Sequence, residues 1–557
     1  MRIRYSRILN ARKTSDSRML AIGLDRCIMR SMRRLNTHIL FLTLMVWLTG
    51  CNLVQASPSI PPTATTLRVA QATAVPTLAR IYQPIAQTQT ATPTPEIRCP
   101  DLPDTPTVQH TVQAEMDFAE QRFETRQRTT FVNRTGETLN DLVFNIEPNR
   151  WPEAFTLLGM LQLQDEGGNV IPNHTLTGRR LYMELVEPLE AGCVVELELL
   201  FVVDVPRISS GVNAFKGFFG HSTRQINTGH WLPSLAVRMD GEWITRQAMF
   251  VGEQEVVRKA DWDVTISAIN APDTLKIAAP GRVREIAPMS WQYIHNNARD
   301  FTVSVSDAFQ VETMQAQSGV FVEVYSFEDA QVITETGVVD AANHALNIAV
   351  RSLEAYEDLY GPYPYERMLV VQGDFPDGME FSGIVFVSTD WFKNFQGDPA
   401  SFLTLITAHE VSHQWWYARV GNDPALSPWL DEALATYSEY VFLEEYYPNL
   451  KAWWWDFRVH VHAPQGFVDR TVYEFTSMRE YINAVYLRGV IMLHAIRTDI
   501  GTEAFFELLR RYIEVGEGQV VTADVFWSVM TPEQIEATQR TRSAYLRRPN
   551  VTAAGGG

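Results

Sequence analysis

Cysteine is scarce in this sequence, with four residues in a chain of 557. So few cysteines exclude a scaffold held together mainly by disulfides, whereas the length predicts several domains with ample hydrophobic core. Cys99 and Cys193 could form one disulfide, which would close a loop of about 95 residues and contribute up to ~4–5 kcal/mol in the chain-entropy view. Two unpaired buried thiols are the alternative.

Long hydrophobic runs are also lacking. The apolar stretch at residues 39–48 is interrupted only by Thr43 and is too short to span a membrane. A basic segment precedes it, and Leu-Thr-Gly-Cys51 follows, which resembles a bacterial lipoprotein signal ending at a lipidated cysteine. We therefore expect residues 1–50 to be a signal peptide and Cys51 to anchor the protein to the extracytoplasmic side of the cell membrane. A short transmembrane anchor or an uncleaved signal is the alternative.

Basic residues are sparse beyond that segment. The first fifty positions hold ten of the 47 Lys and Arg residues and two of the 65 acidic ones, so the remainder has a formal net charge of −26. An acidic chain without a basic stripe is not expected to bind nucleic acid. Residues 51–104 begin with Cys51 and are dominated by Thr, Pro, Ala and Gln, a composition that cannot bury a core and indicates a flexible linker.

The folded part shows two successive patterns. Residues 105–315 contain short runs of alternating polar and apolar residues separated by turn residues, which predicts an N-terminal β domain, either a β-sandwich or a saddle-like sheet. Residues 316–539 contain longer runs with helical periodicity, which predicts a mainly helical α+β domain. We expect residues 540–557 to form a disordered tail.

A candidate metal site lies in the second of these regions. His409-Glu410-Val411-Ser412-His413 falls within a helical run over residues 401–417. Histidines four apart stand one turn above the other on a helix, so both imidazoles can reach one metal ion. Glu410 would lie beside that ion, where a general base for a water molecule belongs.

A third ligand is expected on the next helix. Gly421 ends the first helix in this interpretation, and Ser427-Pro428 offers a cap and a first residue for a second one. Glu432 follows His413 by 19 positions in the sequence Trp-Leu-Asp-Glu-Ala, so an antiparallel return would bring its carboxylate to the metal. Three protein ligands leave one position open, as a catalytic zinc requires.

These motifs resemble peptidase family M1, the aminopeptidase N-like gluzincins. The similarity rests on His-Glu-x-x-His, eighteen residues and then Glu, together with Gln414-Trp415-Trp416 and Trp-Leu-Asp-Glu-Ala, and it covers roughly residues 105–540. It implies a thermolysin-like catalytic domain behind the β domain, one Zn²⁺ per chain and peptide substrates. The large C-terminal helical domain of many relatives has no counterpart here, which would leave a more open active site.

The resemblance also implies substrate-binding residues. The family carries Gly-Ala-Met-Glu-Asn on an edge strand, where the Glu binds the free amino group of the substrate. Met379 and Glu380 match that motif, while Asp377 takes the Gly place, Gly378 the Ala place and Phe381 the Asn place. From the residues alone, positions 374–383 read as a loop between two strands, and Glu380 could be an ordinary exposed carboxylate.

Two further residues complete the predicted site. Tyr486, in Val-Tyr-Leu-Arg-Gly, matches the family tyrosine that stabilises the tetrahedral intermediate, although a core aromatic is the alternative. Glu439 lies seven residues after Glu432 on the same helix face and could orient a ligand, or be a solvated glutamate. Histidines elsewhere, His221 with His230 and His460 with His462, are expected to be structural rather than ligands of a second metal.

The sequence therefore predicts a zinc metallopeptidase, with an aminopeptidase as the leading interpretation. An endopeptidase or another zinc hydrolase of the same architecture is favoured by Phe381 and by the short C-terminal part. A silent surface-binding protein fits less well, because it would not need the base Glu410. Side-chain preference and oligomeric state cannot be read from the residues.

Overall fold

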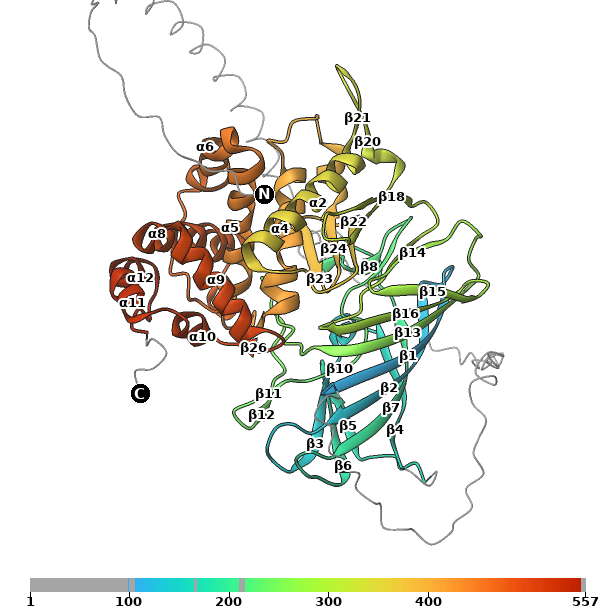
Figure 1. Cartoon of the computed structure of the whole chain (residues 1–557). Coiled ribbons are helices and arrows are strands. Elements are labelled where there is room, and N and C mark those ends of the chain that lie inside the picture. Colours follow the sequence, from blue (N-terminus) through green and yellow to red (C-terminus); the bar gives the residue numbers. More distant parts are fainter. Residues whose placement is uncertain (1–98, 100–105, 165–167, 210–215, 552–557) are drawn as a thin grey trace, which may run out of the picture. The chain divides into compact units, whose positions relative to one another are not determined.

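The computed structural model describes residue 99 and residues 106–164, 168–209 and 216–551, which belong to one compact unit (Figure 1). The signal peptide, Cys51 and nearly all of the linker lie outside the described residues, so the lipid anchor and the extracytoplasmic location stay predictions. Within the described part, no helix combines the length and the apolarity needed to cross a membrane.

The N-terminal β domain is built around a seven-stranded sheet with the order β15-β16-β13-β1-β2-β7-β4. Its strands are β1 (Val108–Asp117), β2 (Arg122–Val132), β4 (Phe155–Leu163), β7 (Val194–Asp204), β13 (Ala260–Ile269), β15 (Arg282–Ala287) and β16 (Ser290–Ala298). Buried residues alternate with more exposed ones along β1 and β2, as the period-two pattern predicts. A disulfide joins Cys99 to Cys193 just before β7, so of the two alternatives for these cysteines the bridge is confirmed.

Two four-stranded sheets complete the β domain, with orders β10-β3-β6-β5 and β14-β17-β9-β8. The strands of the first are β3 (Leu139–Asn145), β5 (His174–Thr177), β6 (Arg180–Leu189) and β10 (Ser234–Leu235). Those of the second are β8 (Phe219–His221), β9 (Ile226–Thr228), β14 (Lys276–Ala278) and β17 (Ser304–Ser306). A hairpin of β11 (Arg238–Met239) and β12 (Glu242–Trp243) leads into a long loop and then β13. Glu253 in that loop lines a small cavity together with Glu380 and Asp431.

A buried histidine lies inside the large sheet. The His110 ring stacks on Trp262 with ring centroids 4.2 Å apart, and the Gln127 side-chain amide donates to His110 Nδ1 over 3.2 Å. Burial lowers the pKa of His110 to about 3, because an imidazolium there would lose its hydration. Nδ1 acts as an acceptor in this network, so the imidazole is neutral in the folded protein.

Acid should therefore destabilise the β domain. Between pH 6.5 and 3 the unfolded chain takes up a proton at His110 that the folded chain does not, so stability falls as pH falls through this window. The His110 contribution to the free energy of unfolding should drop by about 2–3 kcal/mol between pH 7 and pH 4.5. In His110→Gln, thermal unfolding should lose less stability over that interval, whereas the exposed His460→Gln should behave like wild type. Equal acid sensitivity of His110→Gln and wild type would contradict this assignment.

The second domain, which carries the predicted metal site, contains a five-stranded sheet with the order β18-β19-β22-β24-β23. Its strands are β18 (Gln310–Gln315), β19 (Phe321–Ser326), β22 (Arg367–Gly373), β23 (Gly378–Phe381) and β24 (Ile384–Ser388). Strand β18 pairs with β19, so the change of sheet precedes residue 310 rather than following the predicted boundary at 315. The loop expected at 374–383 contains the antiparallel edge strand β23, whose four residues were too few for their pattern to be read as a strand.

Helices surround this sheet and continue to the C-terminal side (Figure 1). They are α2 (Ala341–Tyr360), α3 (Thr389–Lys393), α4 (Phe402–Ser412), α5 (Trp429–Tyr446), α6 (Lys451–Trp454), α7 (Met478–Tyr481), α8 (Arg488–Ile500), α9 (Thr502–Gly516), α10 (Ala523–Ser528), α11 (Pro532–Ala537) and α12 (Gln539–Tyr545). The disordered tail predicted from residue 540 is wrong as far as 551, because α12 occupies its start and Arg547 forms ion pairs with Glu474 and Asp469. Residues 552–557 lie outside the described part.

A buried arginine joins the β domain to the second domain. Arg299, after β16, donates from its guanidinium to the carbonyl oxygens of Val257 and Gln519, each at 2.8 Å. Gly421 lies against the same guanidinium, and a Cβ at this position would overlap it. Gly421 therefore does not end the first helix as predicted; it forms the short strand β25 (Gly421–Asn422), which pairs with β26 (Val520–Val521) and allows this close approach.

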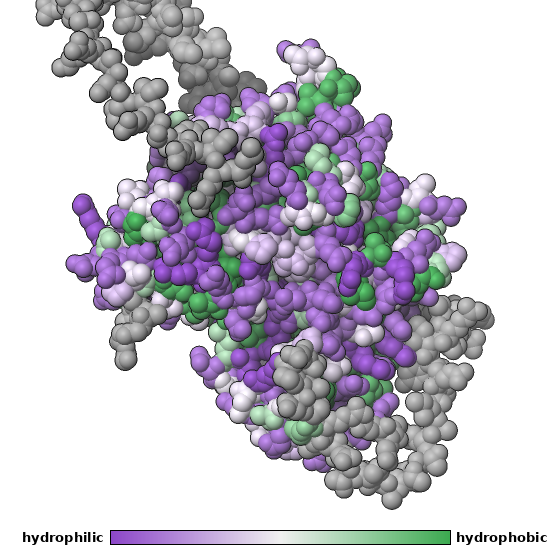
Figure 2. Space-filling model, viewed as in Figure 1, coloured by the Kyte–Doolittle hydropathy of each residue, from purple (hydrophilic) through white to green (hydrophobic). Residues whose placement is uncertain are grey.

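The face viewed in Figure 2 is mostly hydrophilic, with hydrophobic residues in small separate groups among the described residues. One such group lies at the hairpin of β20 (Gln331–Thr334) and β21 (Gly337–Asp340), where Ile333 and Val338 are 86% and 66% exposed. Large continuous apolar patches mark association surfaces, and this view of the described chain shows none.

Candidate active site

Helix α4 carries the two predicted histidines to the end of its regular part. Ser401 caps the helix by accepting a hydrogen bond from the Thr404 amide, and the α-helical geometry ends at Ser412. The chain then widens into a π-helical turn, Gln414–Arg419, a deviation that often occurs at functional sites. The rings of His409 and His413 have centroids 4.9 Å apart, so the prediction that both imidazoles share one side of the helix is confirmed.

Glu432 comes to these histidines from α5. Its Oε2 lies 3.4 Å from His409 Nε2 and 3.8 Å from His413 Nε2. The three ligand atoms all lie within 4.8 Å of one another, an arrangement that one ion could bridge. The helix begins as predicted near Pro428, but Pro428 itself occupies the cap position and Ser427 supplies no side-chain cap.

A second group of the described residues, Glu380, Glu410 and His413, could also converge on an ion. The His413 atom that faces Glu380 is Nδ1, at 3.8 Å, and this nitrogen already bonds to Asp431 Oδ1 over 2.7 Å. That nitrogen is therefore not free to bind a metal. The group formed by His409, His413 and Glu432 fits a metal better, and two imidazoles with one carboxylate are a donor set of catalytic zinc.

Carboxylates behind the histidines fix their orientation. His409 Nδ1 lies 3.0 Å from Glu439 Oε1, and His413 Nδ1 makes the contact with Asp431. An Nδ1–H that donates to a carboxylate leaves the Nε2 lone pair directed at the metal and makes the imidazole a stronger ligand. The predicted orienting role of Glu439 matches this geometry, since its carboxylate is fully buried against His409.

Three residues that hold the two histidines in these orientations were not predicted from the sequence. Asp431 directly precedes Glu432 in the Trp-Leu-Asp-Glu-Ala motif. This position beside a predicted ligand was the feature of the sequence that could have indicated its role. Trp454 Nε1 and the Arg458 guanidinium both donate to Glu439, at 3.0–3.1 Å, and hold its charge in place. They follow α5 in a segment whose pattern gave no reason to connect them with the metal.

Glu410 lies beside the ligands with a free oxygen. The residue is buried, and its Oε2 has no hydrogen-bond partner among the described residues. Burial raises the pKa of Glu410 to about 8, although a cation bound nearby would lower it. Space for this carboxylate depends on Gly378, because a Cβ there would overlap it. A carboxyl group with one free oxygen is able to exchange a proton with a water or a substrate.

Glu380 lies on the edge strand β23 and is 5% exposed, so the alternative of an exposed loop carboxylate is wrong. Burial raises its pKa well above the ordinary value. Gly378 precedes it on the same strand, and the Met379 side chain is buried. The Phe381 ring is also buried, against Phe218 and His230, so it packs in the core and does not form an apolar wall for a substrate.

Gln414 fastens this strand to the metal-binding segment, which sequence reasoning also missed. Its side-chain amide donates to the Phe381 carbonyl over 3.0 Å, and its side-chain carbonyl accepts from the Gly383 amide over 2.9 Å. Because Gln414 directly follows His413, the two hydrogen bonds fix the position of β23 relative to the predicted metal ligands.

Tyr486 lies across the site in a second π-helical turn, Ile482–Leu487, directly before α8. Its ring is nearly parallel to that of His409 at 6.2 Å, and its hydroxyl hydrogen-bonds to Glu432. Burial, followed by the negative charge of Glu432, raises the pKa of Tyr486 well above 10. The phenol therefore stays protonated and can donate to a developing negative charge.

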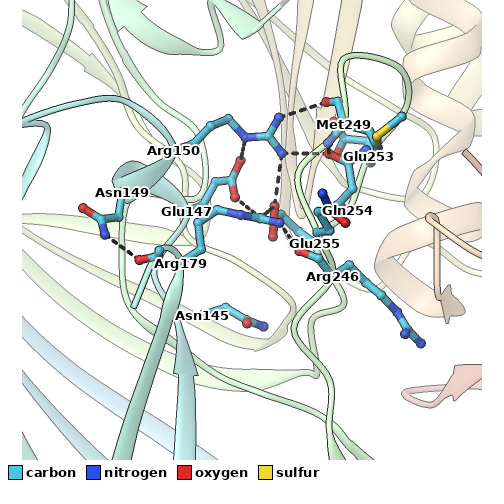
Figure 3. Close-up of polar contacts among 12 residues, drawn as sticks. Asn145, Glu147, Asn149, Arg150, Arg179, Arg246, Met249, Glu253, Gln254 and Glu255 are labelled. Carbon is cyan, nitrogen blue, oxygen red and sulfur yellow. Dashed lines mark hydrogen bonds and ion pairs between the residues drawn. The ribbon is translucent and has the colours of Figure 1, made fainter. Parts of the chain in front are cut away.

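The β domain also reaches the site, through the loop before β13. The buried Arg179 and the half-buried Arg150 both contact the carboxylates of Glu147 and Glu255 (Figure 3). Gln254 accepts from Arg150 over 2.7 Å, which holds the loop to this cluster. Glu253 then lies on a small cavity that Glu380 and Asp431 also line. None of these positions carried a recognisable signal, because they come from separate strands and loops.

The remaining histidines are not part of a metal site in the described chain. The two convergent ligand groups of the described residues contain none of His221, His230, His460 and His462. His230 packs edge-on against Phe381 at 5.0 Å, and the exposed His460 pairs with Asp456.

Comparisons with known proteins agree on the C-terminal part of the chain. Residues 344–541 match the model of the peptidase family M1 domain. Aminopeptidase N of Lactobacillus delbrueckii subsp. lactis is 27% identical over 237 residues, and endoplasmic reticulum aminopeptidase 1 of Homo sapiens is 27% identical over 251 residues. These alignments cover 39% and 41% of this chain but only 27% of each relative. The chain thus spans about a quarter of the length of the curated relatives it matches.

Solved structures extend the similarity to the β domain. A variant of a two-domain M1 zinc metallopeptidase, bound to L-arginine, superposes with a TM-score of 0.58 at 17% identity over 79% of this chain and 93% of that one. An M1 zinc metallopeptidase from Deinococcus radiodurans gives 0.56 at 18% identity, over 80% and 95%. At such identities the likeness shows the fold, including its division into a sheet-rich N-terminal part and a helical C-terminal part.

Proposed function

The chain carries a catalytic domain of peptidase family M1, and from this premise we propose that it is a zinc-dependent aminopeptidase. The observation that carries the proposal is the convergence of His409, His413 and Glu432 beside the partnerless oxygen of Glu410. The similarity to M1 zinc metallopeptidases supports zinc as the metal, and the single preferred ligand group is the reason to propose one ion per chain. We also propose that the domain carrying these residues has the thermolysin-like fold that the family resemblance implies.

Zinc held by these ligands would act as a Lewis acid that polarises the peptide carbonyl and makes a water molecule more acidic. Glu410 accepts the proton of that water through its free oxygen and then delivers it to the leaving amine. Tyr486 donates a hydrogen bond to the oxygen on which negative charge develops, a contribution of about 2.7–4 kcal/mol for donors of this kind. Glu439 and Asp431 keep both imidazoles oriented throughout.

Exopeptidase selectivity is assigned to Glu380. A free amino-terminal ammonium brought into a buried site needs a negative partner, or its desolvation is uncompensated. Glu410 would be engaged with the water and Glu432 with the metal, whereas the buried carboxylate of Glu380 makes no side-chain hydrogen bond to a described residue and has only His413 Nδ1 nearby, at 3.8 Å. The edge position of β23 lets an extended peptide add alongside it, with its amino end at Glu380.

Glu380→Ala tests this assignment. The variant should lose about 10²–10³-fold in kcat/KM for unblocked dipeptides, because a charge-assisted contact at the ammonium is removed. Amino-blocked peptides bring no ammonium and should be affected far less. Zinc content, measured by atomic absorption, should stay at one ion per chain, since Glu380 is outside the preferred ligand group.

The exposed Glu445→Gln serves as a control that should change neither quantity. If Glu380→Ala affected blocked and unblocked peptides equally, the endopeptidase interpretation would replace the aminopeptidase one. Loss of zinc in this variant would instead favour the second ligand group, with Glu380 as a metal ligand.

A further inference from the structure

Asp377 has a backbone conformation that aspartate seldom adopts. Its φ is +69°, in the left-handed region, and it directly precedes β23 at the place where the family motif has glycine. The Ser388 amide donates to its carbonyl oxygen over 2.8 Å, which ties the strained residue to β24. Aspartate and asparagine tolerate this region better than most residues, but glycine tolerates it best. A carboxylate is therefore kept here at a conformational cost.

The side chain of Asp377 is exposed and forms no hydrogen bond or ion pair among the described residues. Desolvation by the surrounding site raises its pKa, and the positive charge of Arg458 opposes that rise. Met379 and Phe381, which would share its face in a regular strand, are 6% and 0% exposed. The left-handed residue breaks that alternation and leaves the carboxylate outside the core. Its charge nevertheless raises the pKa of both Glu410 and Tyr486, so it lies within electrostatic range of the reacting groups.

The order of residues along β23 gives the position of Asp377 relative to a substrate. Glu380 marks the amino end of the peptide, and Gly378 lies against the base Glu410 near the scissile bond. Successive residues of a strand are about 3.3 Å apart, so Asp377 lies roughly 10 Å beyond Glu380, on the leaving side of that bond. The side chain of the second substrate residue falls in this region.

We propose that Asp377 is a specificity-determining residue that favours peptides whose second residue is lysine or arginine. This inference rests on the proposed aminopeptidase function and on the amine site at Glu380. The Arg458 guanidinium, the cation that acts on Asp377 within the protein, is bonded to Glu439. The Asp377 carboxylate, next to the path of the substrate, therefore gains a charge-assisted contact when a cationic side chain arrives. Solvent access at Asp377 limits the preference to about five- to tenfold.

The experiment compares Leu-Arg-Ala with Leu-citrulline-Ala, because citrulline keeps the shape of arginine without its charge. Wild type should show a kcat/KM about five- to tenfold higher for the arginine peptide. Asp377→Asn should bring the ratio close to one while leaving the citrulline peptide nearly unchanged. Asp377→Gly, which suits the backbone, should give the same result and excludes misfolding as the cause.

Asp240→Asn is the matched control, since Asp240 is also an exposed aspartate with positive φ, at +49°, in the β11–β12 turn. It should keep the wild-type ratio. A ratio that persists in both Asp377 variants would overturn the proposal, as would an equal loss for both peptides, which indicates a structural role.

Binding provides a second readout that does not depend on turnover. Calorimetry on the inactive Glu410→Gln protein, with and without Asp377→Asn, should show the same five- to tenfold preference for arginine and its loss. If wild type hydrolysed neither peptide while this binding preference held, the proposed function would fail and the role of Asp377 would stand. Equal binding of the two peptides would overturn the role of Asp377 even in an active enzyme.

Discussion

Glu410→Gln is expected to abolish peptide hydrolysis while leaving zinc bound at one ion per chain. The glutamine keeps the shape of the side chain but cannot accept a proton from the water or return one to the leaving amine. Positioned acid–base groups contribute about 10²–10⁴-fold, and Glu410 is assigned both transfers, so the loss should reach the upper end of this range. Its oxygen without a protein partner is the structural reason for expecting so large an effect.

Atomic absorption and activity on unblocked dipeptides would be measured on the same preparation. The fold should be unaffected, so the variant should melt at the wild-type temperature. Loss of zinc would show that Glu410 is a ligand, as in the second convergent group, and that the metal lies closer to β23. Near-normal turnover with zinc retained would remove Glu410 from the mechanism altogether.

The metal-binding part of this site could be predicted because it depends on local periodicity. Histidines four apart on a helix share a face in any fold, and His409 and His413 do so even though the α-helix ends at Ser412 between them. Glu432 and Tyr486 needed more than periodicity. Glu432 was reached from the start signal of the next helix and an assumed antiparallel return, whereas the role of Tyr486 came from the family motif.

The supporting residues could not be predicted for a related reason. Arg458 and Trp454 reach Glu439 from a later segment, and Glu253 reaches the site on a loop of the β domain held by Arg150. Such contacts are set by tertiary packing and leave no repeat in the sequence. The edge strand β23 was taken for a loop because four residues, one of them after a left-handed aspartate, show too short an alternation.

His413→Ala should lose both zinc and activity, the second of the two largest effects. His413 supplies one of three convergent ligand atoms, and its removal leaves one imidazole and one carboxylate, too few to hold a catalytic zinc tightly. Asp431→Asn should weaken zinc binding as well, but to a smaller extent than His413→Ala. Without the carboxylate at 2.7 Å, the His413 ring loses its fixed orientation and part of its basicity, and zinc affinity should fall about 10–100-fold.

Zinc retention after dialysis against a series of chelator concentrations would separate the three proteins. Wild type should hold the metal at the highest concentration, Asp431→Asn should release it earlier, and His413→Ala should be metal-free before chelator is added. Adding zinc should restore activity to Asp431→Asn but not to His413→Ala, and the exposed His462→Ala should match wild type. Undiminished zinc in His413→Ala would rule this histidine out as a ligand. An Asp431→Asn protein that released zinc no earlier than wild type would show that His409, Glu432 and Glu439 hold the site without the Asp431 contact.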